Sequence, residues 1–302
     1  MNEYIKLPKT AVVLGNFDGI HKGHMLLIEK AKEIAKEEGV KTAIFTFFPH
    51  PSYVLTGKMP VDLIYTNKEK EEIMEQAGID YYIEFPFNKT TAAITYKEFI
   101  EDIVLTKLNA QVVIIGADYR FGSKKQGDYK TLVEYSELYD FDVIVAHKLK
   151  IDNKAISSTW IREEIKNGNI EMANKLMGRP FIISGKIVTG RQIGRNIGIP
   201  TANIIPDHTK ILPPLGVYIS KVMVEKREYY GITNIGKNPT ILDDKNIKIE
   251  THIIDFDKEI YGEEMTISLY KSLRPEIKFD SLEKLKNQIE KDIEVTKKYF
   301  ML

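Results

Sequence analysis

The sequence of 302 residues predicts two domains of different class, an α/β domain with a doubly wound parallel sheet and then a β domain that ends in a helix. Two observations carry this prediction. Runs of β-branched residues alternate with helix-like segments through about residue 150. From Gly178-Arg179-Pro180 onward, short strand-like runs separated by turn residues dominate. We therefore expect domains at 1–178 and 179–302.

The first strand, turn and helix form the most informative segment. The apolar run Ala11–Leu14 predicts a buried strand, and a helix is expected over 24–38, where apolar residues recur at helical spacing and Gly39 follows as a stop. The turn between them, GNFDGIHKGH at 15–24, offers free backbone N–H groups and the positive end of a helix dipole, which suit a nucleotide phosphate. The residues expected to contact phosphate there are Gly15, Asn16, Phe17, Asp18, His21, Gly23 and His24.

The rest of the first half repeats this alternation. Strands are expected at 41–48, 81–87, 112–116 and 141–146, and helices at 67–77, 95–109 and 129–139, the second of them opened by a Thr95–Glu98 capping box. Ligands of such sheets bind beyond the carboxyl ends of the strands. The turn at 15–24, Pro49-His50-Pro51 and the loop at 116–127 all fall at such ends, so we expect them to form one site.

The second half predicts a barrel or sandwich followed by one helix. Strand-like runs occupy 181–190, 216–225, 227–236, 247–256 and 264–273. For the last helix we expect an Asp280–Glu283 capping box, an apolar stripe and only a structural role.

Composition narrows the function classes. Lys plus Arg and Asp plus Glu number 43 each, which gives no support to a nucleic-acid or polybasic membrane partner. The sequence has no cysteine, which excludes disulfides, thiolate nucleophiles and Cys-bound metals. The opening MNEYIKLPK has no apolar core, and no stretch approaches the length of a membrane span. We expect no signal peptide or membrane helix, and a cytoplasmic protein.

Three further patterns in the first half each have a structural and a functional interpretation. In ISSTWIR, at 156–162, Ser157, Ser158 and Thr159 either cap a helix or bind phosphate together with Arg162. The segment at 116–127 is either a mobile loop or part of a pocket, and His50 either caps a turn or binds a ligand.

The motifs of the first half resemble the HxGH nucleotidylyltransferases and, in the longer string GNFDGIHKGH, their flavin adenylyltransferase branch. That resemblance implies transfer of AMP from ATP to FMN, with release of pyrophosphate and without a covalent intermediate. It also implies catalytic roles for His21, His24 and Arg162. The residues that it places beside the flavin are Asp118, Arg120 and Phe121, and on the functional interpretation of its turn His50 is a further flavin contact.

Three patterns in the second half carry chemistry, of which the glycine- and asparagine-rich turn GITNIGKNPT at 231–240 is uninformative alone. In GRQIGRNIGIPTANI, at 190–204, glycines can cradle phosphates, and Thr201 and Asn203 are oxygen donors suited to Mg²⁺. The alternative is a basic hairpin with a polar strand end. In the run at 249–262, Glu250 and His252 lie on one face of a strand, where they form either a site or a structural pair.

These second-half motifs resemble riboflavin kinase, with Ile199 where that family has Phe. The resemblance implies a barrel that phosphorylates the 5′-hydroxyl of riboflavin from MgATP, releasing ADP. Glu250 would be the general base, and Thr201 and Asn203 would hold the metal. The expected nucleotide contacts are Gly190, Arg191, Gly194 and Arg195.

Together the two resemblances imply consecutive reactions, from riboflavin to FMN and from FMN to FAD, with ATP as co-substrate. Three alternatives are another HxGH nucleotidylyltransferase with a regulatory β domain, a flavin- or nucleotide-binding regulator without activity, and a chain with one active and one silent domain. The motifs with Glu250, His21, His24 and Arg162 intact favour the bifunctional enzyme.

Overall fold

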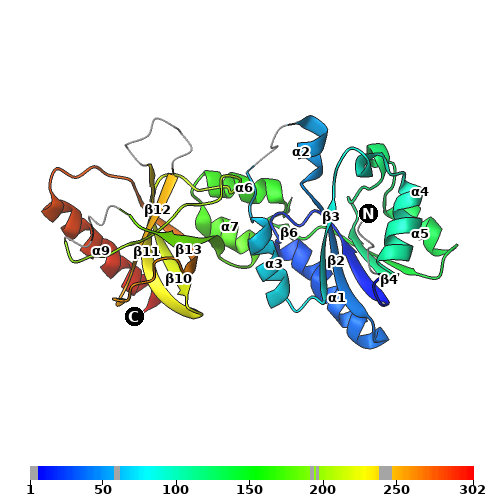
Figure 1. Ribbon diagram of the computed structural model, residues 1–302, viewed down its shortest axis with the longest axis horizontal. Coiled ribbons are helices and arrows are strands. Elements are labelled where there is room, and N and C mark those ends of the chain that lie inside the picture. Colours follow the sequence, from blue (N-terminus) through cyan, green and yellow to red (C-terminus); the bar gives the residue numbers. More distant parts are fainter. Residues whose placement is uncertain (1–5, 58–61, 191–193, 195–196, 238–246) are drawn as a thin grey trace. The chain divides into compact units, whose positions relative to one another are not determined.

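The computed structural model describes residues 6–57, 62–190, 194, 197–237 and 247–302 (Figure 1). Contacts divide the chain into two compact units, one formed by the residues up to Asp62 with Asn67–Ser157, the other by Leu63–Thr66 with Ser158–Leu302. By this division the two helices after Ser157 pack with the barrel described below. The expected functional boundary after Gly178 stays a prediction.

A five-stranded sheet with the order β3-β2-β1-β4-β5 forms the centre of the first unit. All of its neighbouring strands pair in parallel, and the order reverses between β1 and β4, as predicted for a doubly wound sheet. The strands are β1 (Thr10–Leu14), β2 (Lys41–Phe48), β3 (Tyr81–Pro86), β4 (Ala110–Gly116) and β5 (Asp142–Ala146).

Helices cover both faces of this sheet. Helix α1 (Lys22–Glu38) packs on β1, β2 and β4, while the opposite face buries side chains of η2 (Phe99–Lys107) and α5 (Tyr129–Ser136). The Thr95–Glu98 capping box is confirmed, but the segment η2 that follows α4 (Tyr96–Glu98) is a π-helix. The other elements of the unit are α2 (Pro51–Thr56), α3 (Asn67–Gln76), η1 (Thr91–Ala93), η3 (Ser123–Lys125), β6 (Lys150–Ile151) and β7 (Lys154–Ala155).

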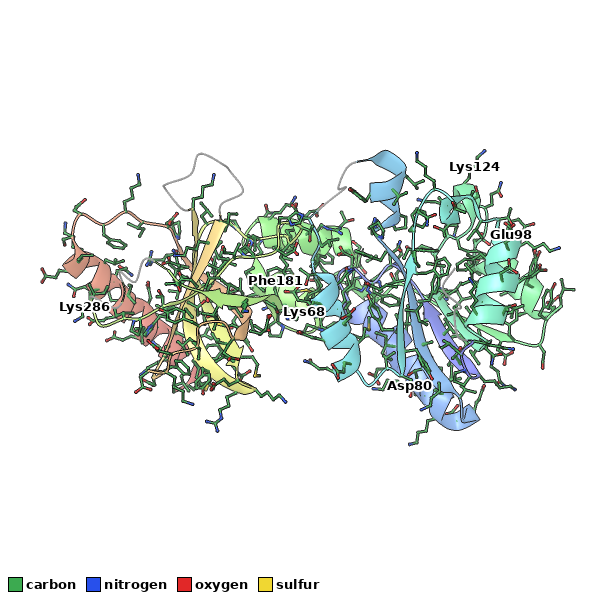
Figure 2. The ribbon with its side chains drawn as sticks, in the orientation of Figure 1. Lys68, Asp80, Glu98, Lys124, Phe181 and Lys286 are labelled. Carbon is green, nitrogen blue, oxygen red and sulfur yellow. The ribbon has the colours of Figure 1, made fainter. Side chains whose placement is uncertain are left out.

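At the amino end of the sheet, the carboxylate of Asp80 fixes the start of β2 to the residue before β3. Asp80, labelled in Figure 2, accepts hydrogen bonds from the backbone N–H (2.9 Å) and hydroxyl (2.8 Å) of Thr42 and pairs with Lys41 at 2.8 Å. These contacts lower the pKa of Asp80, although its partial burial opposes them.

A closed barrel of six antiparallel strands forms the second unit, in the order β10-β11-β12-β9-β8-β13. The predicted runs all appear as strands, and the PTANI segment adds a short one, β9, between β12 and β8. The strands are β8 (Phe181–Val188), β9 (Ala202–Ile204), β10 (Gly216–Val224), β11 (Arg227–Lys237), β12 (Ile247–Ile253) and β13 (Glu264–Pro275).

The barrel unit also contains α6 (Ser158–Lys166), α7 (Ile170–Met177) and the Leu63–Thr66 segment. The buried Lys210 holds this segment, because its ammonium donates to the Ile64 carbonyl at 2.7 Å and lies 4.6 Å from the ring centre of Phe181, labelled in Figure 2.

The terminal helix α9 (Leu282–Phe300) begins one residue later than expected. Its N-cap is Ser281, whose hydroxyl accepts from the Lys284 backbone N–H, so the predicted Asp280–Glu283 capping box is wrong. Asp280 instead pairs with the Lys284 ammonium at 3.1 Å. Within the described residues, we find no helix with both the length and the apolar character needed to cross a bilayer.

Candidate active sites

The HxGH turn joins β1 to α1. His21 is the N-cap of α1, and its Nδ1 accepts from the His24 backbone N–H at 3.3 Å. The two imidazoles stack with ring centres 3.8 Å apart. The buried Ile20 before them has a φ of 33°, a conformation that a β-branched residue adopts only at a cost. The turn therefore holds both rings in one fixed arrangement at the helix N-terminus.

Both histidines are neutral near pH 7. Burial lowers the pKa of His21 to about 4, and burial together with the neighbouring His21 ring lowers the pKa of His24 well below its usual value. Because His21 Nδ1 accepts a hydrogen bond, its proton lies on Nε2. His24 Nδ1 is buried and has no hydrogen-bond partner among the described residues. The pair thus offers a neutral donor and an unsatisfied buried nitrogen.

The ends of β4 and β5 bring charges to the same turn. Asp118 and Lys148 pair at 2.8 Å, and both are close enough to influence the pKa of His21, the first raising it and the second lowering it. Lys148 was not among the predicted site residues. Its place directly after the fifth strand of a parallel sheet is the signal that would have found it.

An aromatic cavity of about 530 Å³ lies at the carboxyl edge of the sheet; we call it the sheet-edge cavity. It brings together parts of the three predicted segments, namely Asn16 after β1, Pro51 after β2, and Arg120 with Phe121 after β4. Its aromatic side chains come from β2, β3–η1, η2 and the loop after β4: Phe47, Phe87, Phe99, Tyr119 and Phe121. Such a cavity suits a flat ring system.

The loop that closes the sheet-edge cavity depends on a glycine. Phe121 and Gly127 exchange two backbone hydrogen bonds, at 3.0 and 2.9 Å, and a Cβ at Gly127 would overlap the Phe121 ring. The turn between them carries Lys124, labelled in Figure 2, which lies at the cavity edge. The segment at 116–127 is therefore a built cavity wall with an exposed basic tip.

Several predicted residues lie outside the sheet-edge cavity lining. His50 accepts from the Tyr53 backbone N–H through its carbonyl at the start of α2. Asp118 faces Lys148. Ser157 ends the first unit, whereas Ser158, Thr159 and Arg162 lie on α6 of the second. Their roles stay predictions.

A second cavity, of about 540 Å³, lies between the barrel and α9; we call it the barrel–helix cavity. Glu250 and His252, two residues apart on β12, both line it, as alternation predicted. They do not bond each other: Glu250 Oε1 pairs with Lys248 at 2.7 Å, and His252 Nδ1 contacts the Pro200 carbonyl at 2.8 Å. Gly194 and Thr201 also line this cavity, as does Asn234 of the predicted 231–240 segment. Arg274 and Asp292 line it too, although the sequence patterns did not single them out.

The predicted metal ligands meet beside this cavity. Asn203 is buried, its amide N–H donates to the Thr201 carbonyl at 3.3 Å, and its Oδ1 has no partner among the described residues. A Cβ at Gly190 would overlap the Asn203 amide, so glycine leaves this side chain its room. No cluster of three or more His, Cys, Asp or Glu suited to a metal occurs in the part of the chain that the structure describes. An unsatisfied amide oxygen near a threonine fits a hard cation that takes its other ligands from phosphates.

A third cavity, of about 490 Å³, lies under the loop after β12; we call it the β12-loop cavity. It shares Thr201 and His252 with the barrel–helix cavity, and its other side carries Asp255, Asp257 and Glu259. The two cavities thus meet at Thr201. The predicted nucleotide residues Arg191 and Arg195 lie outside the described residues.

The comparisons with known proteins agree in both halves. A model of the FAD synthetase family matches residues 5–160, and one of the riboflavin kinase family matches 177–300. Relatives named "Bifunctional riboflavin kinase/FMN adenylyltransferase" include one of Bacillus subtilis (strain 168), 38% identical over 97% of this chain and 93% of its own length. Another, of Buchnera aphidicola subsp. Schizaphis graminum (strain Sg), is 40% identical over 97% of this chain and 95% of its own.

A solved structure shares the fold. It is titled "Crystal Structure of Macrolide-efflux Protein from Streptococcus pneumoniae", has a TM-score of 0.88 and 33% identity, and the match covers 97% of this chain and 95% of that one.

Proposed function

The chain belongs to the family of bifunctional riboflavin kinases/FMN adenylyltransferases, and on this premise we propose which of its residues carry each reaction. The chain uses ATP to convert riboflavin to FMN and then FMN to FAD. We assign the first reaction to the barrel half and the second to the α/β half, which the riboflavin kinase match at 177–300 and the FAD synthetase match at 5–160 support.

For the kinase reaction, we propose that riboflavin occupies the barrel–helix cavity and ATP the β12-loop cavity. The first has an apolar lining for the ring system and carries Glu250. In the β12-loop cavity, three carboxylates stand beside Lys258 and their net negative charge repels phosphates. The phosphates would therefore lie at the shared Thr201 end, with the ribose hydroxyls toward the carboxylates of Asp255, Asp257 or Glu259. This arrangement points the γ-phosphate at the flavin chain.

The phosphoryl step follows from these positions. The riboflavin 5′-oxygen attacks the γ-phosphorus of ATP, its proton passes to the Glu250 carboxylate, and the bond to the β–γ bridging oxygen breaks with its electron pair leaving on ADP. The Lys248 pair engages Oε1 of Glu250 and restrains the carboxylate. Glu250 thereby acts as general base and as an anchor for the hydroxyl.

Mg²⁺ would be held by Asn203 Oδ1 and the Thr201 hydroxyl, and when bound it neutralises charge on the ATP phosphates. We expect Asn203→Ala to raise the Mg²⁺ concentration needed for half-maximal FMN formation about tenfold, because it removes one ligand. Conversion of FMN to FAD should keep its Mg²⁺ dependence. An unchanged requirement in the kinase assay would contradict the assignment.

For adenylylation, we propose that the FMN ring occupies the sheet-edge cavity and that its phosphate extends past Asn16 to the HxGH turn. An FMN phosphate oxygen attacks the α-phosphorus of ATP, and the bond to the α–β bridging oxygen breaks as pyrophosphate leaves. His21 donates from Nε2, His24 lies beside it, and the α1 N-terminus supplies further N–H groups. Arg162 with Ser157, Ser158 and Thr159 would bind ATP phosphates in the same reaction.

We also propose a cytoplasmic location, because both reactions consume ATP. The observation that carries the assignment of sites is the presence of two separate cavities, each lined by residues of one matched family motif. A time course with riboflavin, ATP and Mg²⁺, resolved by chromatography, should show FMN first and FAD later. FMN without FAD would mean a silent α/β half, and no FMN would remove the kinase assignment.

A further inference from the structure

The wall that α9 gives to the barrel–helix cavity is held by a polar contact. Leu282, Leu285 and Ile289 line the cavity, and Leu282 is 54% exposed. The fully buried side chains of α9 are Asp292 and Thr296. The apolar residues near the start of this helix therefore face space for a ligand. Asp292 attaches this part of α9 to the barrel, while the end of the helix is attached by Phe300, whose ring centre lies 4.8 Å from that of Tyr230 and 5.1 Å from that of Tyr270.

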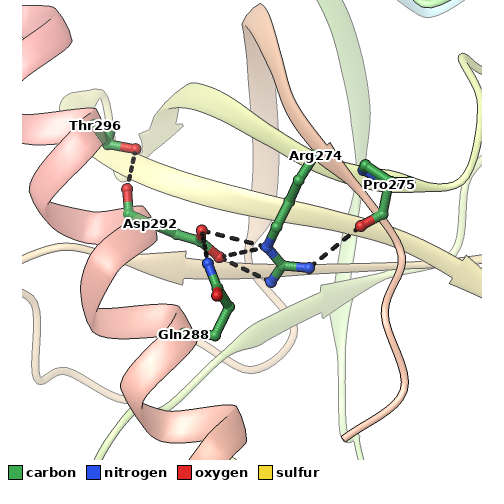
Figure 3. Close-up of polar contacts among 5 residues, drawn as sticks. All are labelled: Arg274, Pro275, Gln288, Asp292 and Thr296. Atoms are coloured by element: carbon green, nitrogen blue, oxygen red, sulfur yellow. Dashed lines mark hydrogen bonds and ion pairs between the residues drawn. The ribbon is translucent and has the colours of Figure 1, made fainter.

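Asp292 forms a forked ion pair with Arg274 of β13 (Figure 3). Arg274 Nε lies 3.0 Å and Nη2 2.8 Å from Asp292 Oδ2, and Gln288 Nε2 donates to Oδ1 at 2.9 Å. Arg274 Nη1 also donates to the Pro275 carbonyl at 3.3 Å, and the Thr296 hydroxyl to the Asp292 carbonyl at 2.8 Å. Arg274 Nε also lies 3.3 Å from Asp292 Oδ1, so three charge-assisted contacts between two planar groups fix their distance and angle together.

The pair belongs to the cavity and not only to the packing behind it. Arg274 and Asp292 both line the barrel–helix cavity, and the Arg274 guanidinium lies 5.8 Å from the ring centre of Phe279, which lines it too. Their side chains are 15% and 3% exposed. This ion pair therefore links β13, α9 and the connection at 276–281, which together form one wall of the cavity.

Stability alone does not account for an ion pair at this depth. Taking two charges out of water carries a large desolvation penalty, and apolar residues of similar volume often stabilise a protein as well or better. What the forked pair supplies is a defined geometry. The leucine and isoleucine side chains that α9 presents to a ligand need such a fixed position, because apolar contacts alone would allow the helix to shift along the barrel.

We propose that Arg274 and Asp292 are positioning residues for riboflavin in the kinase reaction. They set the distance between the barrel and the part of α9 that lines the cavity, and so the width of the slot that receives the ring system together with Glu250. This inference rests on the proposed binding of riboflavin in the barrel–helix cavity. Neither residue takes part in proton or phosphoryl transfer.

The test compares two variants with wild type in the full-length protein. Asp292→Asn removes the charge and keeps the shape, whereas Arg274→Met/Asp292→Leu removes both charges and restores an apolar contact. Each should raise the riboflavin KM about tenfold or more, since misplacing a bound group by about 1 Å costs up to about 100-fold. The ATP KM and FMN-to-FAD conversion should change less than about twofold, because those sites lie elsewhere.

Controls separate positioning from folding. Lys286→Gln removes an exposed ion pair with Glu290 on the same helix (Lys286 is labelled in Figure 2) and should leave every constant unchanged. A double variant as stable as wild type, with its riboflavin KM still raised, would support positioning. A wild-type riboflavin KM in that variant would overturn it.

Glu250→Gln, assayed in parallel, tests the premise. If it loses kinase activity while the Arg274 and Asp292 variants keep their riboflavin KM, the positioning inference fails and the cavity assignment stands. If Glu250→Gln keeps kinase activity, the cavity assignment itself fails.

Discussion

The two candidate sites handle phosphate in opposite ways. The HxGH turn offers two histidines with lowered pKa and the end of a helix, whereas the barrel offers the carboxylate of Glu250 and the amide oxygen of Asn203. The nucleophiles explain the difference. FMN already carries an anionic phosphate and needs only donors, but riboflavin attacks through a neutral hydroxyl, which must lose a proton.

The largest expected effect is the loss of the kinase reaction when the carboxylate in the barrel is removed. Glu250→Gln keeps the shape of the side chain and removes its basicity, so FMN formation from riboflavin should fall about 100- to 10,000-fold. FMN-to-FAD conversion should be unchanged, as measured by chromatography of the flavins. Glu228→Gln, which breaks an exposed pair with Lys221, is the matched control. A loss of both reactions in Glu250→Gln would sink the two-site assignment.

The next largest expected effect is the loss of FAD formation when a histidine of the HxGH turn is removed. His24→Ala should lower FAD formation about 100- to 1,000-fold, the usual cost of a lost donor to developing charge, and leave the kinase rate as it is. His208→Ala, at an exposed histidine, controls for the substitution. Normal FAD synthesis in His24→Ala would remove this residue from the mechanism.

The protonation of His21 sharpens the comparison. The pKa of His21 is about 4 in the folded protein and near 6.5 in the unfolded chain. Between these pH values the His21 ring is therefore protonated in the unfolded chain but neutral in the folded protein. Stability should therefore fall as pH falls, by about 2 kcal/mol between pH 7 and pH 5 from this group. Denaturant unfolding at both pH values should show a smaller loss in His21→Asn. An imidazole NMR titration of His21 near 6.5 would contradict the neutral-donor account.

The smallest expected effect concerns the shape of the sheet-edge cavity. Gly127→Ala places a methyl group against the Phe121 ring and should raise the FMN KM about tenfold in the adenylyltransferase assay, with the kinase reaction unaffected. Gly39→Asn is the control, because open space surrounds that left-handed position and asparagine tolerates it. An unchanged FMN KM would place the ring elsewhere.

Local patterns predicted the elements well, because each rule acts within a few residues. The strand–turn–helix around His21, the Thr95 cap and the alternation of Glu250 with His252 all follow from nearest neighbours in the chain. Predictions of position at strand ends also succeeded in part: Asn16, Arg120 and Phe121 share one cavity.

What the sequence did not reveal depends on contacts between distant segments. Arg274 and Asp292 stand 18 residues apart in unremarkable surroundings, and only the seating of α9 on the barrel makes them a cavity wall. Lys148 can be assigned to the site only once the strand order is known. The Leu63–Thr66 segment can be assigned to the barrel unit only through its contact with Lys210. The cap at Ser281 was misassigned because Asp280 and Ser281 are both good caps, and the turn before α9 decides between them.

The measurement that tests the central claim most directly is a complementation assay. Glu250→Gln and His24→Ala are each incubated with riboflavin, ATP and Mg²⁺, alone and mixed, and FMN and FAD are followed by chromatography. We predict no flavin nucleotide from the first, FMN alone from the second, and FAD after a lag from the mixture. FAD from either variant alone at the wild-type rate, or the absence of FMN from His24→Ala, would contradict two separate sites in one chain.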